Sequence, residues 1–76
     1  MLLPSDIIIR IVAAGGGFTI DLEKNILPFD VMIRIAAAAG QSGALITFRV
    51  GESLLPSDYM IRIAAAGKGN VIFDIS

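Results

Sequence analysis

Three aspartate–arginine pairs are the most regular candidates for polar chemistry in this chain. In each pair the arginine follows the aspartate by four residues, a spacing that brings both side chains to one helical face with the acid in the favoured N-terminal position. A row of arginines could bind an anion, but each arginine has its own aspartate to compensate its charge. We therefore predict structural ion pairs on a solvated helical face, between Asp6 and Arg10, Asp30 and Arg34, and Asp58 and Arg62.

Two glycine-rich segments could be taken for phosphate-binding loops, Gly15-Gly16-Gly17 and Gly67-Lys68-Gly69. A phosphate loop precedes a helix and uses the positive N-terminal end of that helix. Both segments instead follow predicted helices, where the negative helix end suits the Lys68 ammonium group better than a phosphate. Tyr59 has no neighbouring base, so we expect it to pack with its hydroxyl group in water. We predict no catalytic residue, no metal site and no cofactor.

The composition excludes several classes of function. The 76 residues include no cysteine and no histidine, which removes thiol chemistry, thiolate metal sites and the commonest general base. A formal net charge of -1 disfavours nucleic-acid binding, which needs clustered Lys and Arg. The N-terminus has no signal-peptide pattern, and the longest uncharged stretch, Ile35 to Phe48, is interrupted by glycines and polar residues and is too short to span a bilayer. We expect a cytoplasmic protein that is not an enzyme and does not bind membranes.

The aspartate–arginine pairs lie in a segment that the chain repeats three times, at Leu3–Ile11, Leu27–Ile35 and Leu55–Ile63. Each copy begins with Leu-Pro and runs into alanines and then glycine. Proline fits the first helical position, and the aspartate two residues later places a carboxylate in the first turn, where the helix dipole favours it. Glycine is typical of helix C-termini, so we predict helices that stop at Gly15, Gly40 and Gly67.

A short alternating segment follows each predicted helix, at Phe18–Leu22, Ile46–Val50 and Val71–Ile75. The period of two is typical of strands with one buried face. Aligning the copies predicts three inward rows: Phe18/Ile46/Val71, Ile20/Phe48/Phe73 and Leu22/Val50/Ile75. It also predicts an outward row in which Arg49 stands between Asp21 and Asp74. This charge order favours an α/β fold with a three-stranded parallel sheet in the order 1-2-3, right-handed crossovers and all helices on one face.

The repeat length indicates a known architecture. Pro4, Pro28 and Pro56 lie 24 and 28 residues apart, and each unit holds one helix and one strand. Units of this size, with helices on one face of a sheet and the other face open, resemble the leucine-rich-repeat class of α/β solenoids. The resemblance implies a short solenoid over the whole chain. We predict a single domain, 1–76, made of repeats 2–25, 26–53 and 54–76.

The composition and the chain ends predict self-association. Apolar residues make up 55% of the chain and charged residues 17%, so a monomer would be short of polar surface. Solenoids close their ends with polar capping repeats, yet the first predicted helix begins near Met1 and the last strand ends near Ser76. We expect the exposed ends to be Ile7, Ile8, Ile9 and Ile11 on one side and the strand edge Val71–Ile75 on the other.

A homodimer is the predicted assembly, because joining two like ends closes the structure, whereas head-to-tail contacts propagate into fibres. The predicted function is a structural or protein-interaction module that binds itself and, as an option, another protein. The alternative is a small binding protein whose open sheet face or subunit interface holds a ligand, an anion being one option.

Overall fold

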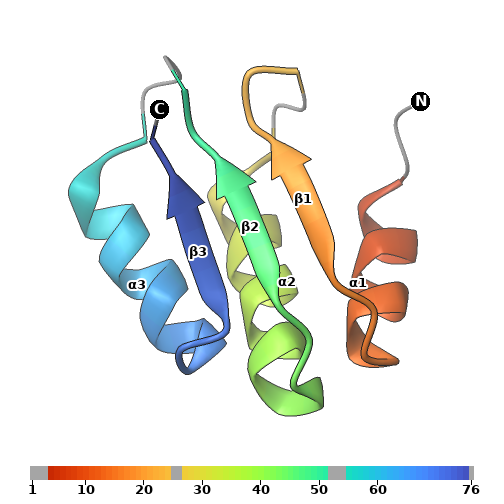
Figure 1. Cartoon of the computed structure of the whole chain (residues 1–76). Helices are drawn as coiled ribbons and strands as arrows, with labels where there is room; N and C mark the ends of the chain where they lie inside the picture. The colour runs from red at the N-terminus through yellow and green to blue at the C-terminus, as the bar shows by residue number, and fades with distance from the viewer. Residues whose placement is uncertain (1–3, 25–26, 52–54, 76) are drawn as a thin grey trace.

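The computed structural model describes residues 4–24, 27–51 and 55–75 of the chain. Helices and strands alternate along it: α1 (Ser5–Ala13), β1 (Phe18–Asp21), α2 (Phe29–Ser42), β2 (Ile46–Arg49), α3 (Ser57–Gly67) and β3 (Val71–Asp74). The strands form one sheet, and the helices lie side by side behind it (Figure 1). The protein is therefore a two-layer α/β structure, with one face of the sheet covered by helices and the other open.

The sheet is parallel and has the strand order β1-β2-β3, which confirms the predicted order and direction. Phe18 lies opposite Ile46, and Ile46 lies opposite Val71, which is the register of the aligned copies. Seen from the open face with the strands pointing up, each successive strand lies further to the left and the connecting helix passes behind (Figure 1). This is the right-handed crossover that a twisted parallel sheet favours.

Each helix begins directly after a proline. The carbonyl oxygens of Pro4, Pro28 and Pro56 accept hydrogen bonds of 3.0–3.2 Å from N–H groups three and four residues later. The prolines were predicted at the first helical position, but they occupy the N-cap, and each helix begins one residue later. Their fixed φ of -57° to -60° suits the extended backbone that enters each helix. The aspartate two residues later lies in the first turn, as predicted.

Glycine marks the end of α1 and α3, with a small shift in α3. α1 ends at Ala13, and Gly15 then adopts the left-handed conformation with φ of 101°. Gly67 is the last residue of α3, and the left-handed conformation falls on Lys68, with φ of 51°. Lys68 places its cation at the negative end of the helix.

The predicted end of α2 at Gly40 is wrong, because the helix continues to Ser42 and the left-handed residue is Gly43, with φ of 83°. Packing explains why a glycine stands inside this helix. A Cβ atom on Gly40 would lie 2.9 Å from the carbonyl oxygen of Ala66 in α3. Gly40 therefore allows the backbones of α2 and α3 to approach closely, rather than ending a helix.

The core lies between β2 and the helices. The largest side chains with almost no exposed surface are those of Phe48, Ile35, Ile46, Ile63 and Val12. The predicted inward rows hold for the first two strands, where Leu22 and Val50 are buried one residue beyond the strand ends. Ile75 is an exception at 65% exposed, because it follows the last residue of an edge strand and nothing in the described structure covers it.

Two polar side chains tie successive units together. The Ser42 hydroxyl group donates a hydrogen bond of 2.6 Å to the carbonyl oxygen of Val12 in α1. The Asn70 amide Nδ2 donates one of 3.0 Å to the carbonyl oxygen of Ala39 in α2. Carbonyl groups in the last turn of a helix have no N–H partner within the helix. In both cases a side chain from the next unit supplies a hydrogen-bond donor to such a carbonyl group.

Candidate interaction surfaces

The six helical aspartates and arginines all lie on the exposed surface. Within the described residues, no ion pair joins Asp6 to Arg10, or either of the equivalent pairs in α2 and α3. Side chains of this length change rotamer freely in water, and such a pair contributes only about 0.2–0.5 kcal/mol to a helix. The structure thus brings each pair to one helical face without joining its charges.

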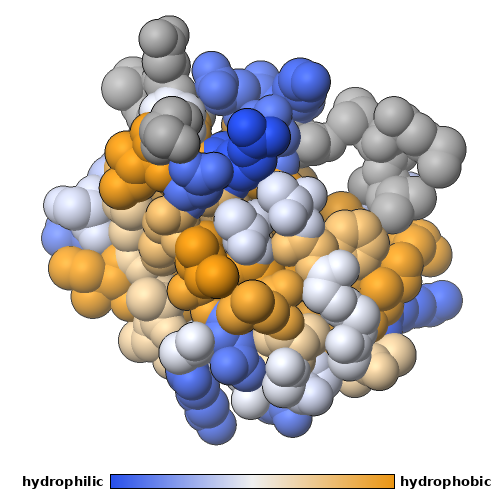
Figure 2. Space-filling model, in the orientation of Figure 1, coloured by the Kyte–Doolittle hydropathy of each residue, from blue (hydrophilic) through white to orange (hydrophobic). Residues whose placement is uncertain are grey.

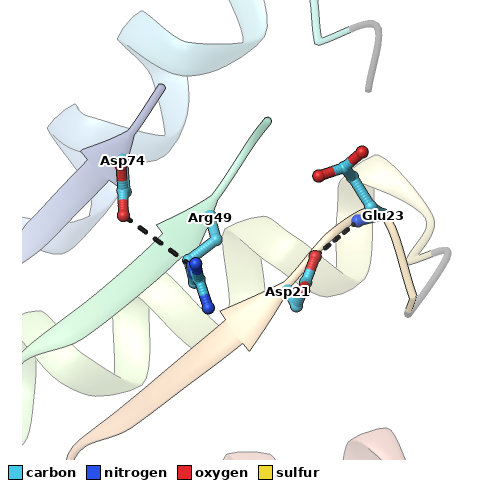
Figure 3. A network of polar contacts seen from close by, with 4 residues as sticks. All are labelled: Asp21, Glu23, Arg49 and Asp74. Carbon is cyan, nitrogen blue, oxygen red and sulfur yellow. Dashed lines mark hydrogen bonds and ion pairs between the residues drawn. The ribbon is translucent and has the colours of Figure 1, made fainter. Parts of the chain in front are cut away.

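The structure brings together Asp21, Arg49 and Asp74 at the carboxyl ends of the strands. The register places Arg49 opposite Asp21 on one side and opposite Asp74 on the other. Arg49 Nε lies 3.8 Å from Asp74 Oδ2, and Asp21 Oδ1 accepts a hydrogen bond of 2.9 Å from the N–H of Glu23 (Figure 3). The Arg49 and Asp74 side chains are 58% and 39% exposed, so water screens the pair. Two carboxylates beside one guanidinium group also work against binding of an anion in this row.

The open face of the sheet is divided into a charged and a less polar part. Hydrophilic residues gather near the carboxyl ends of the strands, and apolar surface extends over much of the rest of this view, β3 and α3 included (Figure 2). Thr19, Thr47 and Ile72 form the row that precedes the charged row in the register. Ile72, on the edge strand β3, is the apolar member of this row and is 45% exposed, and Leu45, which directly precedes β2, is 51% exposed.

Replacing Arg49 by aspartate should destabilise the fold more than replacing it by alanine, because three carboxylates would then lie side by side. Like charges directly opposite each other cost roughly 0.2–1 kcal/mol per pair. The urea midpoint should fall from wild type to Arg49→Ala to Arg49→Asp, and the gap between the variants should shrink at about 1 M salt. Equal midpoints for both variants at low salt would contradict this account of the row.

One aromatic contact identifies which side of each helix faces its neighbour. Phe29 at the start of α2 stacks on Tyr59 of α3, with ring centroids 4.1 Å apart and an interplanar angle of 27°. Residues four apart share a helical face, so Ile33 lies on the side of α2 that faces α3, and Ile63 on the side of α3 that faces α2. We call the side facing the next unit the downstream side and the side facing the previous unit the upstream side.

The downstream side of α3 exposes a large apolar residue. Ile9, Ile33 and Ile61 occupy the same position in the three copies. Ile9 and Ile33 are half-buried against the core, whereas Ile61 is 67% exposed. The difference follows from position in the stack, since α3 has no helix on its downstream side in the described structure. Ile61 was not among the predicted exposed residues, although its place in the last of the three copies was a usable signal.

The upstream side of α1 is exposed to a smaller extent. Ile11 is 37% exposed, whereas the equivalent Ile35 and Ile63 are fully buried between neighbouring helices. The prediction that Ile8 and Ile9 belong to this exposed end is wrong, because Ile8 is only 8% exposed and Ile9 packs against the core on the downstream side. Ile8 faces the core, as the equivalent Met32 does at 5%.

A scan against protein-family models, a search of curated proteins and a search of solved structures each found no match. None of the helices in the described residues is long and apolar enough to cross a membrane. The same residues contain no group of three or more His, Cys, Asp or Glu side chains that could hold a metal ion.

Proposed function

We propose that this protein is a non-enzymatic structural or protein-interaction module that assembles with itself. Its three helix–strand units act as a short solenoid, and the ends of the stack are the contact surfaces. The observation that carries the proposal is the exposure of Ile61. Two equivalent isoleucines are half-buried beside the core, and Ile61, on the same helical position, is 67% exposed.

The free energy available at such an end is considerable. Burying a large aliphatic side chain stabilises a contact by roughly 1.5–3 kcal/mol relative to leaving it in water. Ile61, Ile72 and Ile75 are all at least 45% exposed, and all lie in α3, in β3 or directly after β3. A second copy that covers this group removes apolar surface from water in the same way that each unit covers its neighbour within the chain.

A homodimer is the simplest closed form of this assembly. A symmetric contact between two like ends uses each contact surface once and stops, whereas a head-to-tail contact leaves a free end at each step and forms fibres. The proposed unit is therefore a pair of chains, within which the sheet and the layer of helices are each doubled.

Light scattering and sedimentation at micromolar concentration test the proposal. We expect a discrete species of twice the 8.0 kDa monomer mass. The double variant Ile11→Lys/Ile61→Lys charges both ends at exposed positions and should return the monomer mass with an unchanged circular dichroism spectrum. Gln41→Lys, on an exposed position of α2, is the control and should leave the mass unchanged. A wild-type mass of 8.0 kDa would overturn the proposal.

A further inference from the structure

Strand β3 directs backbone hydrogen-bonding groups to an edge of the sheet. On the β3 side, the backbone hydrogen bonds to β2 are made by even-numbered residues. The Ile46 N–H donates to Asn70 O at 2.9 Å, and the Val50 N–H donates to Asp74 O at 2.7 Å. In a parallel pair, the N–H and C=O groups of one residue point to the same neighbour, and successive residues alternate. The backbone groups of Val71 and Phe73 therefore point away from β2, to an edge that no strand of the described structure covers.

Apart from Asp74 at the end of the strand, the side chains of β3 are apolar. Ile72 in the strand is 45% exposed, Ile75 just beyond it is 65% exposed, and Ile61 in the adjacent helix is 67% exposed. Val71 and Phe73 are half-buried and extend the packed face of the sheet to the edge. An apolar strand at an open edge is a ready site for pairing with another strand.

The opposite edge, at β1, is more polar. Phe18 and Leu22 donate their N–H groups to β2, at 3.3 Å and 3.0 Å, so the backbone groups of Thr19 and Asp21 point to the outer edge. Just beyond the strand, the Asp21 carboxylate accepts a hydrogen bond from the N–H of Glu23. Asp21 has its equivalent in Asp74 on β3, so the edges differ in Thr19, which stands where β3 has the exposed Ile72. A polar residue at this position disfavours pairing, which makes β3 the better contact edge.

The charges select the direction in which β3 pairs. Head-to-tail stacking would place β1 of a second copy beside β3 in the existing parallel register, with Asp74 opposite Asp21 of that copy. Like charges directly opposite each other destabilise a strand pair. Antiparallel pairing of β3 with β3 of the second copy avoids this contact and leaves Asp74 beside Arg49.

We propose that β3 pairs antiparallel with β3 of a second copy across a twofold axis at Ile72, joining the two sheets into one. This inference rests on the self-association proposed above and specifies its surface. The axis at Ile72 sets this exposed side chain directly opposite its counterpart and keeps the two Asp74 carboxylates apart. A one-residue shift of the axis to Phe73 would place each Ile72 opposite an Asp74, and an axis at Asp74 would place the two carboxylates together.

The same axis covers the exposed helix. A twofold axis perpendicular to the sheet keeps the helices of both copies on one face, so the two α3 helices lie antiparallel beside each other. Ile61 then meets the C-terminal half of the other α3, where Ala64 and Ala65 are small and at least partly exposed. Small side chains permit the close helix approach that α2 and α3 already make within the chain.

Cysteine cross-linking tests the position of the axis, because the chain contains no cysteine. In the proposed dimer the two Ile72 residues lie directly opposite each other and form no backbone hydrogen bonds to one another. The Cα atoms of such an antiparallel pair lie about 4.5 Å apart, which is within the range that a disulfide can bridge. Ile72→Cys treated with oxidised glutathione should give a dimer on a non-reducing gel that dithiothreitol reverses. Thr19→Cys occupies the equivalent position on β1 and should remain unlinked at the same concentration. Linking of Thr19→Cys in preference to Ile72→Cys would overturn the inference.

Single charge substitutions test the same surface without cross-linking. Ile61→Lys and Ile72→Lys should each weaken dimerisation at least tenfold in sedimentation equilibrium, and Ile11→Lys at the other end should leave it unchanged. If Ile11→Lys dissociates the dimer, while Ile61→Lys and Ile72→Lys leave it intact, this inference is overturned and the proposed self-association stands. A monomeric wild-type chain would overturn both proposals.

Discussion

Replacing Phe48 by alanine should remove a large part of the stability of this fold. Phe48 lies on the central strand, is fully buried and stacks on Phe73 with ring centroids 5.9 Å apart. Truncation of a buried phenylalanine costs roughly 3–5 kcal/mol, because the apolar contacts are lost and a cavity remains. A chain of 76 residues has a total stability of about 4–11 kcal/mol, so the loss is a large fraction of the total.

Urea unfolding followed by circular dichroism measures this loss. All variants must be compared at one protein concentration, because association adds to apparent stability. Phe73→Ala is the matched control: it removes the same ring from the edge strand, where the side chain is only half-buried, and should cost clearly less. If Phe73→Ala destabilised the protein as much as Phe48→Ala, the core would not be centred on β2.

Replacing Gly40 by alanine should destabilise the protein, although the same change inside most helices is stabilising by about 1 kcal/mol. The added Cβ atom would lie 2.9 Å from Ala66 O and 3.1 Å from the carbonyl carbon and oxygen of Gly67. These are backbone atoms of α3, so the clash can be relieved only by moving one helix from the other. Forcing extra atoms into a packed contact costs typically about 1–3 kcal/mol, which exceeds the gain in helix propensity.

The sign of the change in unfolding free energy is the measurement that matters for Gly40. Gln41→Ala is the control, because it places alanine at the next position of the same helix on the exposed face and should be nearly neutral. Gly40→Val should be worse than Gly40→Ala, since its branched side chain requires a larger displacement. A stabilised Gly40→Ala variant would show that α2 and α3 do not approach as closely as described.

Strand order and direction were predictable from sequence because they depend on a repeated local pattern. A period of two determines which side chains share a face, and a shift by one residue would turn every apolar side chain outward. The repeat then aligned Arg49 with Asp21 and Asp74, and the structure has these residues opposite one another. Helix starts were predictable to within one residue, since proline restricts the backbone wherever it stands.

The end of α2 was decided by tertiary packing. Glycine has the same local preferences at a helix end and at a helix–helix crossing, and only the distance between Gly40 and α3 separates the two roles. The ties from Ser42 to Val12 and from Asn70 to Ala39 escaped prediction for the same reason. They join residues about thirty positions apart that meet only after the units stack.

Exposure of the repeated isoleucines shows most directly what local sequence leaves open. Ile33 and Ile61 lie in nearly identical segments, each followed by Arg-Ile-Ala-Ala-Ala. Local sequence determines that both are helical and on the downstream side of their helices. Burial depends on what lies across the interface: α3 covers Ile33, while nothing in the described structure covers Ile61, and the surface this leaves exposed is the basis of the proposed assembly.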